Sequence, residues 1–579
     1  QEVRDRLDGH LRGLLGASEA LWHRAGWFSD MSRDSGDAPG RRLSSYEQVD
    51  LSPSEDDILP RRRLSRSTSM AWVERLLRRI WPKVDSALRK IVKEQVEGKV
   101  QALSSATSGL YFSVFTLGKQ IPMVRFVEVW EAPCRRSERD RQGLELRVGI
   151  ALQAASDKDN VRIEITDSGT GMKAGVRSLS VEGELVVRLD PLLETFPVVG
   201  GVVAYFLDPP KVDATFEGLA KIADFALLQS RVRGIINGSI AEILVLPNVL
   251  HVPFVKDEDV VDSALLKDPK PAGVLRVTPL RARELTGVDW HFFSKATSDP
   301  YMRLMLSADE WRSSVVYKTC DPVWSTGEYN DFLVYDLEQR LRIDVHDWGP
   351  LKSHDLLGYV KPRKVMDLLR WSEQPMPLLG PDVDPARAAS TVSGEQRGEV
   401  VVRFEWLQII PEREMEDGAI VRIKIDELYI PSAVDAALAS ITARIGSAVK
   451  STKAVRGAPV LEAAALKGTS PAHAEDTVVF EVEHVLNLTL PPGVMPCSQV
   501  LELSVVNGRR KVLGTCTVDL AEVADTPGMR KTWARHARLH FASRSGHGST
   551  NAVMSAEVVV SWHGLQKVPP ADLPSELDD

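Results

Sequence analysis

Four aspartates in the middle of the chain are spaced in a way that suits the binding of a metal ion. Asp289 and Asp299 stand in one loop just before an expected strand, and Asp347 and Asp355 stand in another loop just after one. If the two loops meet at one end of a β-sandwich, four carboxylates converge there. Oxygen donors without nitrogen or sulfur suit calcium, which takes about six to eight oxygen ligands in flexible geometry. The charges would repel one another without a cation, so binding would order the loops.

Large apolar residues flank the same carboxylates. Such residues at a loop tip are what shallow insertion into a bilayer interface requires. The candidates for membrane insertion are Trp290, Phe292, Phe293, Trp348 and Leu351. The alternative is that some of them, Phe292 or Phe293 first, pack into the edge of the sandwich.

Two β-rich regions surround and follow these loops. Residues 271–410 contain short strands such as GVLRVTPL and EVVVRFEWL between Gly, Pro, Asp and Ser loops, which predicts a sandwich of two sheets with a long insert at 380–397. Residues 418–565 repeat the pattern weakly, since EVVVSW near the end echoes EVVVRF of the first region. The segment SAVDAALASITARIGSAV in the second region is expected to be helical.

Residues 70–254 combine helical and strand patterns. Apolar residues from Leu77 to Val96 recur at spacings of three and four, with basic residues between them, which predicts an amphipathic helix that includes Pro82. Residues 144–152, 161–165 and 179–189 then alternate between apolar and polar residues, which is typical of long antiparallel strands with one apolar face. The region is therefore expected to be an α+β unit.

A sheet with one long apolar face and helices laid along it either packs densely or leaves a channel. Acyl chains filling such a channel would gain about 0.8 kcal/mol per buried CH₂ group. For each candidate the alternative is ordinary core packing. The candidate lipid-lining residues are Val148, Ile150, Ile163, Val181, Leu185, Val187, Tyr205 and Phe216.

The ends of the chain do not show the pattern of a folded domain. Residues 1–68 are expected to be a disordered or linker region, and residues 566–579 a tail. The basic segment RRRLSRSTS at 61–69 is either a kinase site, a contact for lipid headgroups, or a solvated linker.

Composition and motifs exclude several classes of protein. A net charge of −8 argues against a general nucleic-acid binder, and four dispersed cysteines argue against a zinc framework or a disulfide-rich secreted scaffold. The longest apolar run, at 198–207, is too short to span a bilayer, although an anchor upstream of Gln1 stays open. The sequence contains no GxSxG, P-loop, HExxH or kinase motifs, so a non-enzymatic role is expected.

The segments SDPYMRL, KTCDPVWSTGEYNDFLV, HDWGPLKSHDLLG and EVVVRFEWL resemble a C2 domain, in the order that this family uses. The spacing of Asp289 and Asp299 is similar to that in the first C2 domain of the extended synaptotagmin and tricalbin family. The resemblance implies that Asp289, Asp299, Asp347 and Asp355 occupy four of five calcium-binding positions. Gly349 stands at the fifth, so we expect reduced calcium occupancy or constitutive docking on phospholipid.

Residues 70–254 resemble the lipid-binding SMP domain that precedes the C2 domains in that family. The resemblance rests on AWVERLLRRIWPKV, LYFSVFTLGKQIPMV, RLDPLLETFPVVGGVVAYFLDPPKVDATFEGL and ILVLPNVLHVPF. ADFALLQS replaces the family's Asp-x-Pro-Gly turn before the final helix. Residues 418–565 resemble a degenerate C2 domain without the aspartate cluster.

This resemblance implies an α+β SMP-like domain followed by two all-β C2-type sandwiches. It also implies transfer of phospholipids or other glycerolipids, tethering to an anionic membrane surface, and a homodimer formed by the SMP-like domain. The expected location is the cytoplasmic face of membranes, at contacts between endoplasmic reticulum and plasma membrane. The alternatives are a structural scaffold that binds membrane or protein without transferring lipid and, more weakly, an enzyme whose site has no familiar motif.

Overall fold

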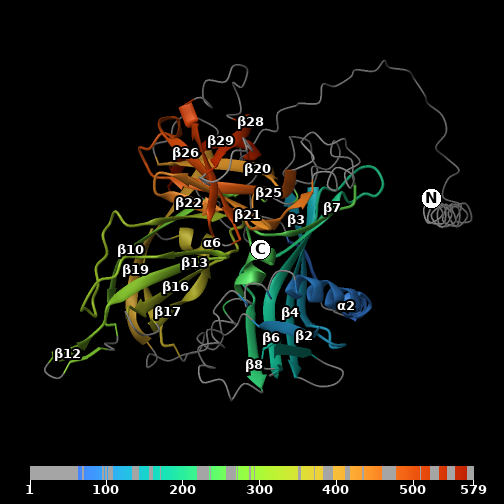
Figure 1. Ribbon diagram of the computed structural model, residues 1–579. Helices are drawn as coiled ribbons and strands as arrows, with labels where there is room; N and C mark the ends of the chain where they lie inside the picture. Colours follow the sequence, from blue (N-terminus) through green and yellow to red (C-terminus); the bar gives the residue numbers. More distant parts are fainter. Residues whose placement is uncertain are drawn as a thin grey trace, which may run out of the picture. The chain divides into compact units, whose positions relative to one another are not determined.

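The computed structural model, shown in Figure 1, describes most of the chain from Arg63 onward. Within these residues no helix combines the length and apolarity needed to cross a membrane. Of the linker expected at 1–68, residues 1–62 lie outside the described residues. Of the tail expected at 566–579, residues 566–568 belong to a strand and residues 570–579 lie outside the description. The described residues are 63–67, 71–93, 109–133, 142–155, 161–169, 173–217, 237–255, 271–285, 289–291, 294–349, 354–370, 372–381, 396–410, 417–432, 436–459, 477–508, 510–521, 534–543 and 554–569, with a few single positions between them.

The first part of the chain forms an antiparallel sheet. Its strands run in the order β1-β3-β4-β6-β5-β2, while β7 and β8 both pair with β6 and β9 pairs with β7. Arg63–Ser67, expected to belong to the linker, instead forms strand β1 against β3. The strands are β1 Arg63–Ser67, β2 Leu110–Thr116, β3 Met123–Pro133, β4 Gln142–Ala155, β5 Arg162–Asp167, β6 Lys173–Leu189, β7 Gly201–Phe206, β8 Lys211–Glu217 and β9 Leu250–Pro253.

Helix α2 (Ala71–Ile91) lies along this sheet, as Figure 1 shows in blue. Pro82 lies within the helix, and Trp81 beside it is buried. The Trp81 indole donates a hydrogen bond to the carbonyl of Gly118 at 3.1 Å, and Asp85 Oδ1 accepts one from the amide of Leu117 at 2.6 Å. These two side chains anchor the helix to the turn between β2 and β3. Of the helical stretch expected at 219–244, residues 237–244 are helical and residues 218–233 lie outside the description.

The middle of the chain is a β-sandwich around one apolar core. Strands β10, β15, β18 and β19 form one group of neighbours and β13, β14, β16 and β17 another, with side chains such as Phe332, Ile343 and Val402 buried between them. The elements are β10 Gly273–Arg283, β11 Asp289–His291, β12 Ser294–Thr297, β13 Pro300–Leu306, β14 Asp309–Arg312, β15 Asn330–Val334, β16 Arg340–Asp347, β17 Asp355–Lys364, α6 Val365–Leu369, β18 Glu373–Leu379 and β19 Gln396–Ile410.

The last part of the chain is a second all-β unit with its own core. Its elements are β20 Ala419–Pro431, β21 Leu438–Ile445, β22 Ala448–Ser451, β23 Val455–Arg456, β24 Ala458–Pro459, β25 Thr477–Leu490, the 3₁₀ turn η4 Pro496–Ser498, β26 Val500–Asn507, β27 Val512–Asp519, β28 Ala534–Ser543 and β29 Met554–Val568.

The helix expected within 432–449 is wrong. Strands β21 and β22 pair as a hairpin there, with Ile445 opposite Ala448. Ala439, Ile441, Ala443 and Ile445 are all buried, which is the two-residue period of a strand. The alanines suggested a helix, but packing of alternate residues into a core overrides local propensity.

The two sandwiches are joined through their final strands. Strand β19 pairs with β29 from Trp406 opposite Val568 to Ile410 opposite Gly564. Lys567 reinforces this junction, because its amide donates to Asp417 and its ammonium group pairs with Glu405. The hydrogen-bonded sheet is therefore continuous from one unit to the next.

A buried cluster is shared by all three parts of the chain. Tyr205 and Leu207 from the first part pack with Leu407 from the second and with Ile420 and Leu565 from the third. All five side chains are at most 4% exposed. The three parts therefore share a core instead of being held only by linkers.

Candidate functional site

Long apolar rows line one face of the first sheet. Leu146 and Val148 of β4 lie directly opposite Val187 and Leu185 of β6. Residues paired in this way point to the same face. All four side chains are half-buried, unlike the cores of the two sandwiches. This set, which we call the apolar face, leaves hydrocarbon accessible along two neighbouring strands.

The apolar face continues onto the strands on either side. Val127 of β3 lies opposite Val148, and Phe206 of β7 lies opposite Leu185. The Phe206 ring lies over Gly183, where a Cβ atom would come within 3.2 Å of the ring. The apolar face therefore spans four strands. Sequence reasoning missed Phe206, because residues 202–207 are all apolar and do not show which alternate set shares a face with Leu185.

Helix α2 covers part of this face. Val73 is buried against Val124 and Val127, and Leu77 packs at the same place beside Val148. Further along the helix, Trp81 lies in a dense core with Leu152 and Ile163. The face is therefore filled at one end and more open at the other.

The predicted lining residues divide between these two ends. Val148, Ile150, Leu185 and Val187 are half-buried and lie on the apolar face. Ile163 belongs to the dense core under the helix, and Val181 packs against it. The side chain of Phe216 lies outside the described residues.

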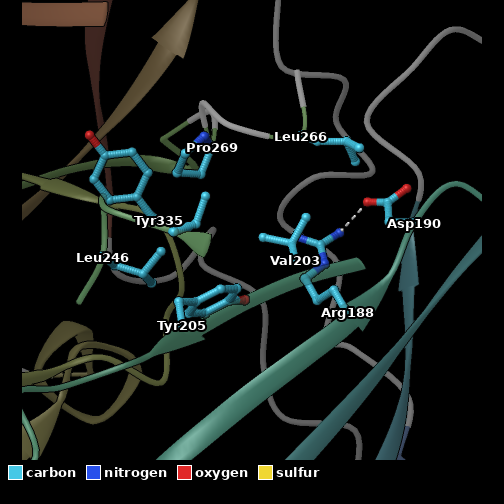
Figure 2. Close-up of a pocket in the computed structure, with 9 residues that line it drawn as sticks. Arg188, Asp190, Val203, Tyr205, Leu246, Leu266, Pro269 and Tyr335 are labelled. Atoms are coloured by element: carbon cyan, nitrogen blue, oxygen red, sulfur yellow. Dashed lines mark hydrogen bonds and ion pairs between the residues drawn. The ribbon is translucent and has the colours of Figure 1, made fainter. Parts of the chain in front are cut away.

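The prediction for Tyr205 is wrong. Tyr205 lies opposite Val186, on the other face of the sheet, and is 4% exposed in the cluster shared by the three parts. It also lines the small cavity in Figure 2, with Arg188, Val203, Leu246 and Tyr335. This cavity of about 30 Å³ has room for about one water molecule and none for an acyl chain.

The polar face of the sheet is buried in part, where it meets the middle sandwich. Arg147 is 2% exposed and pairs with Glu145 at 2.8 Å, with Asp336 at 3.4 Å and with Glu338 at 3.5 Å. Its guanidinium also lies 4.9 Å from the centre of the Trp130 ring. Alternation identified two faces, but it could not reveal that another unit covers the polar one.

A second ionic contact crosses the same boundary. The amide of Arg340 donates to Asp208 Oδ1 at 2.9 Å, and Nη1 of Arg340 donates to Oδ2 at 3.1 Å. Burial raises the pKa of Asp208 to about 6, against the opposing effect of Arg340. Burial also raises the pKa of Glu184, which lies 3.8 Å from the Arg340 guanidinium.

The predicted metal-binding aspartates lie at one end of the middle sandwich. Pro300, next to Asp299, pairs with Asp347, and Asp347 pairs with Asp355 across neighbouring strands. Asp347 Oδ1 accepts a hydrogen bond from the amide of Asp299 at 2.6 Å, while Asp299 Oδ1 accepts one from the amide of Lys318 at 2.7 Å. Two carboxylates therefore already use one oxygen each for backbone groups.

A calcium cage is not complete in this part of the structure. Among the described residues, no three His, Cys, Asp or Glu side chains gather closely enough to hold a metal ion. Asp289 lies on strand β11, and its side chain is outside the description. Asp299, Asp347 and Asp355 are the described carboxylates of the predicted set, and Gly349 offers no carboxylate at the fifth expected position.

Of the predicted membrane-inserting residues, Trp348 is described. It is half-buried, its ring meets Tyr317 edge to face at 5.8 Å, and its amide donates to the carbonyl of Asp299 at 2.9 Å. Tyr317, which sequence reasoning missed, is 60% exposed. Phe292, Phe293 and Leu351, and the side chain of Trp290, lie outside the described residues.

Two protein-family models match the chain. The synaptotagmin-like mitochondrial-lipid-binding domain (SMP) matches residues 67–255, and the C2 domain matches residues 273–366. The apolar face lies in the first match, and the loop aspartates lie in the second.

Known proteins match both regions together. The chain is 29% identical over 354 residues to extended synaptotagmin-1 of Rattus norvegicus, covering 60% of this chain and 29% of the relative. It is 26% identical over 371 residues to extended synaptotagmin-3 of Homo sapiens, covering 62% of this chain and 38% of the relative. The chain thus matches less than two fifths of the length of these relatives.

A solved structure supports the same fold. It contains the SMP domain and two C2 domains of extended synaptotagmin 2, and it superposes on this chain with a TM-score of 0.55 at 19% identity. The superposition covers 86% of this chain and all of that one. The α+β unit followed by two C2-type sandwiches is therefore confirmed as the fold.

Proposed function

The chain joins an SMP lipid-binding domain to C2-type sandwiches in the order found in the extended synaptotagmins, and on this basis we propose that it is a non-enzymatic carrier of phospholipids or other glycerolipids between two membranes. Residues 70–254 would hold the lipid, residues 271–410 would dock on an anionic membrane, and residues 418–565 would support them.

The apolar face is the observation on which this proposal rests. Its half-buried rows on β4 and β6 offer an acyl chain a run of hydrocarbon contacts. A monomeric protein gains stability by covering such a surface, and a lipid tail covers it without a dedicated protein partner. The polar headgroup would stay near water at the open end of the face.

Membrane tethering belongs to the middle sandwich in this proposal. The two loops that contain Tyr317 and Trp348 would rest in the interface, where amphipathic aromatic side chains are favoured. Calcium, when bound, would supply positive charge that attracts anionic headgroups, with reduced occupancy because Gly349 offers no carboxylate. A homodimer formed by the SMP domain, and a location where the endoplasmic reticulum meets the plasma membrane, complete the proposal.

Native mass spectrometry of the purified full chain tests the carrier role. The full chain is the appropriate sample, because the SMP domain shares a buried cluster with both sandwiches. We expect bound glycerolipid, strongly reduced by Leu185→Trp combined with Val187→Trp. Leu438→Trp is a matched control, because Leu438 is an exposed residue of the last unit.

A structural scaffold is the alternative function. The dense core around Trp81 and Ile163 favours it, since part of the sheet is already filled by side chains. A folded chain that carries no lipid and extracts none from vesicles would support the scaffold and exclude the carrier.

A further inference from the structure

Helix α2 presents an exposed apolar row beside the stripe that packs on the sheet. Trp72, Leu76 and Ile80 are 50%, 52% and 40% exposed. Their spacing of four residues places them along one line of the helix. The apolar pattern that begins at Leu77 includes both Ile80 and Trp81, and of these two only Trp81 enters the core.

A basic row runs beside the apolar one. Arg75, Arg79 and Lys83 each follow a member of the apolar row by three residues, and all are exposed. Of the two acidic residues in the helix, Asp85 is buried and pairs with Arg89 at 2.9 Å, so Glu74 alone opposes this charge. The outer side of the helix therefore combines accessible hydrocarbon with net positive charge.

This combination matches the interface of an anionic bilayer. Interfacial helices place Trp, Leu and similar residues at the level of the acyl boundary and place Arg and Lys against headgroup phosphates. A soluble acidic protein would satisfy the basic row but would leave Trp72, Leu76 and Ile80 without an apolar environment.

We propose that the outer side of helix α2 docks on an anionic phospholipid surface, with Trp72, Leu76 and Ile80 in the interface and Arg75, Arg79 and Lys83 on headgroups. The neighbouring side of the helix contacts the apolar face, because Val73 and Leu77 pack with Val127 and Val148. Docking would thus bring the bilayer to within one helix diameter of that face, about 10 Å. The proposed membrane contact depends only on helix α2. The further idea that this contact helps the apolar face to take up lipid rests on the proposed function.

Flotation of the full chain with vesicles tests the contact. The probes are phosphatidylcholine vesicles with and without 30 mol% phosphatidylserine, in EDTA to exclude any contribution of calcium. Arg75→Gln with Arg79→Gln should weaken binding to the anionic vesicles about thirtyfold, since each basic residue near the surface contributes about a factor of five. Arg75→Lys with Arg79→Lys preserves charge and should bind like the original chain.

A second measurement isolates the helix from the C2 domain. A fluorophore on Leu76→Cys, in a chain whose four cysteines are replaced by serine, should shift to the blue on anionic vesicles and be quenched by spin labels on the lipid chains. The same fluorophore on Val500→Cys, an equally exposed site in the last unit, should show neither effect. Absence of the shift at position 76 would overturn the proposal.

The same variants distinguish the other outcomes. If a second copy of the chain covers the apolar row, Leu76→Glu with Ile80→Glu will convert a dimer to a monomer in light scattering without weakening vesicle binding, which would also overturn the proposal. Co-purified lipid should be unchanged in these variants, because the row is exposed and does not belong to the apolar face. Absence of co-purified lipid from the unmodified chain would instead count against the carrier function.

Discussion

Arg340 of the C2 domain binds Asp208 of the SMP domain with both its backbone amide and its guanidinium, at 2.9 and 3.1 Å. Asp208 follows strand β7 by two residues, and Arg340 begins strand β16. Two elements that are far apart in the sequence are thereby fixed to each other at a partly buried position. The stability of this boundary depends on the protonation of the carboxylate.

The Asp208 contact should make folding sensitive to pH. The pKa of Asp208 rises from an ordinary value of 3.8 to about 6, so the folded chain binds more protons than the unfolded chain between these values. Its contribution is fully present below about pH 4 and is lost as the pH rises through 6, at a cost on the order of 3 kcal/mol. The thermal unfolding temperature of the full chain should therefore fall from pH 5 to pH 7.

Asp208→Asn is the control for this pH effect. It cannot titrate, so its midpoint of unfolding should fall less over the same interval. An equal fall in both proteins would show that other groups, such as Glu184, govern the response.

Removing the guanidinium of Arg147 should destabilise the chain strongly. Arg147→Ala leaves the buried carboxylates of Glu145 and Asp336 without their cation, which typically costs about 3–5 kcal/mol. Denaturant unfolding measures the loss. Arg162→Ala, which breaks the exposed pair with Glu164, should cost less than about 1 kcal/mol. A similar decrease in the free energy of unfolding in both variants would contradict the proposed importance of burial.

The shared cluster should couple the unfolding of the three units. Leu565 is fully buried among residues of all three parts, so Leu565→Ala should cost about 2–5 kcal/mol and lower the unfolding temperature of the SMP domain as well. Leu503→Ala removes an equally buried leucine inside the last unit alone. Hydrogen exchange of strand β7 reads out the difference, and equal exchange in the two variants would disprove the coupling.

Calcium binding at the C2 loops should be weak. Asp299 and Asp347 already use one oxygen each for backbone amides, and Gly349 supplies none. Calorimetry of the full chain should give an affinity weaker than about 10⁻⁵ M, the upper limit of typical calcium sensors. Gly349→Asp should tighten binding at least tenfold, while Asp347→Asn should abolish it. Tight binding by the unmodified chain would refute this expectation.

Sequence patterns identified the main architecture because the SMP strands are long and mostly alternating. Residues 144–152 of β4 and 179–189 of β6 keep a two-residue period in most positions, which favours strands over helices. The same pattern identified Val148, Leu185 and Val187 as one face. It failed for Tyr205, because a run of consecutive apolar residues at 202–207 does not indicate which alternate set faces inward.

Burial of the polar face could not be predicted from a local pattern. Glu145, Arg147 and Arg188 have the character of solvent-facing residues, yet each is at most 6% exposed. Arg147 pairs with Asp336, 189 residues further along the chain, and only the docking of one unit on another brings these two together. Long-range ionic contacts of this kind leave no periodic trace in a sequence.

The continuous pairing of β19 with β29, together with the shared cluster, bears on how this chain could be recombined. A domain joined by a loop can be exchanged between relatives as an independent module. Here an SMP domain taken from a relative would lack the residues that contact Leu407 and Arg340. A chain cut after Ile410 would expose Ile409 and the edge of strand β19 that pairs with β29. Substitutions at these boundaries must be compensated in a neighbouring unit, so we expect the three units to diverge in concert and to be inherited together.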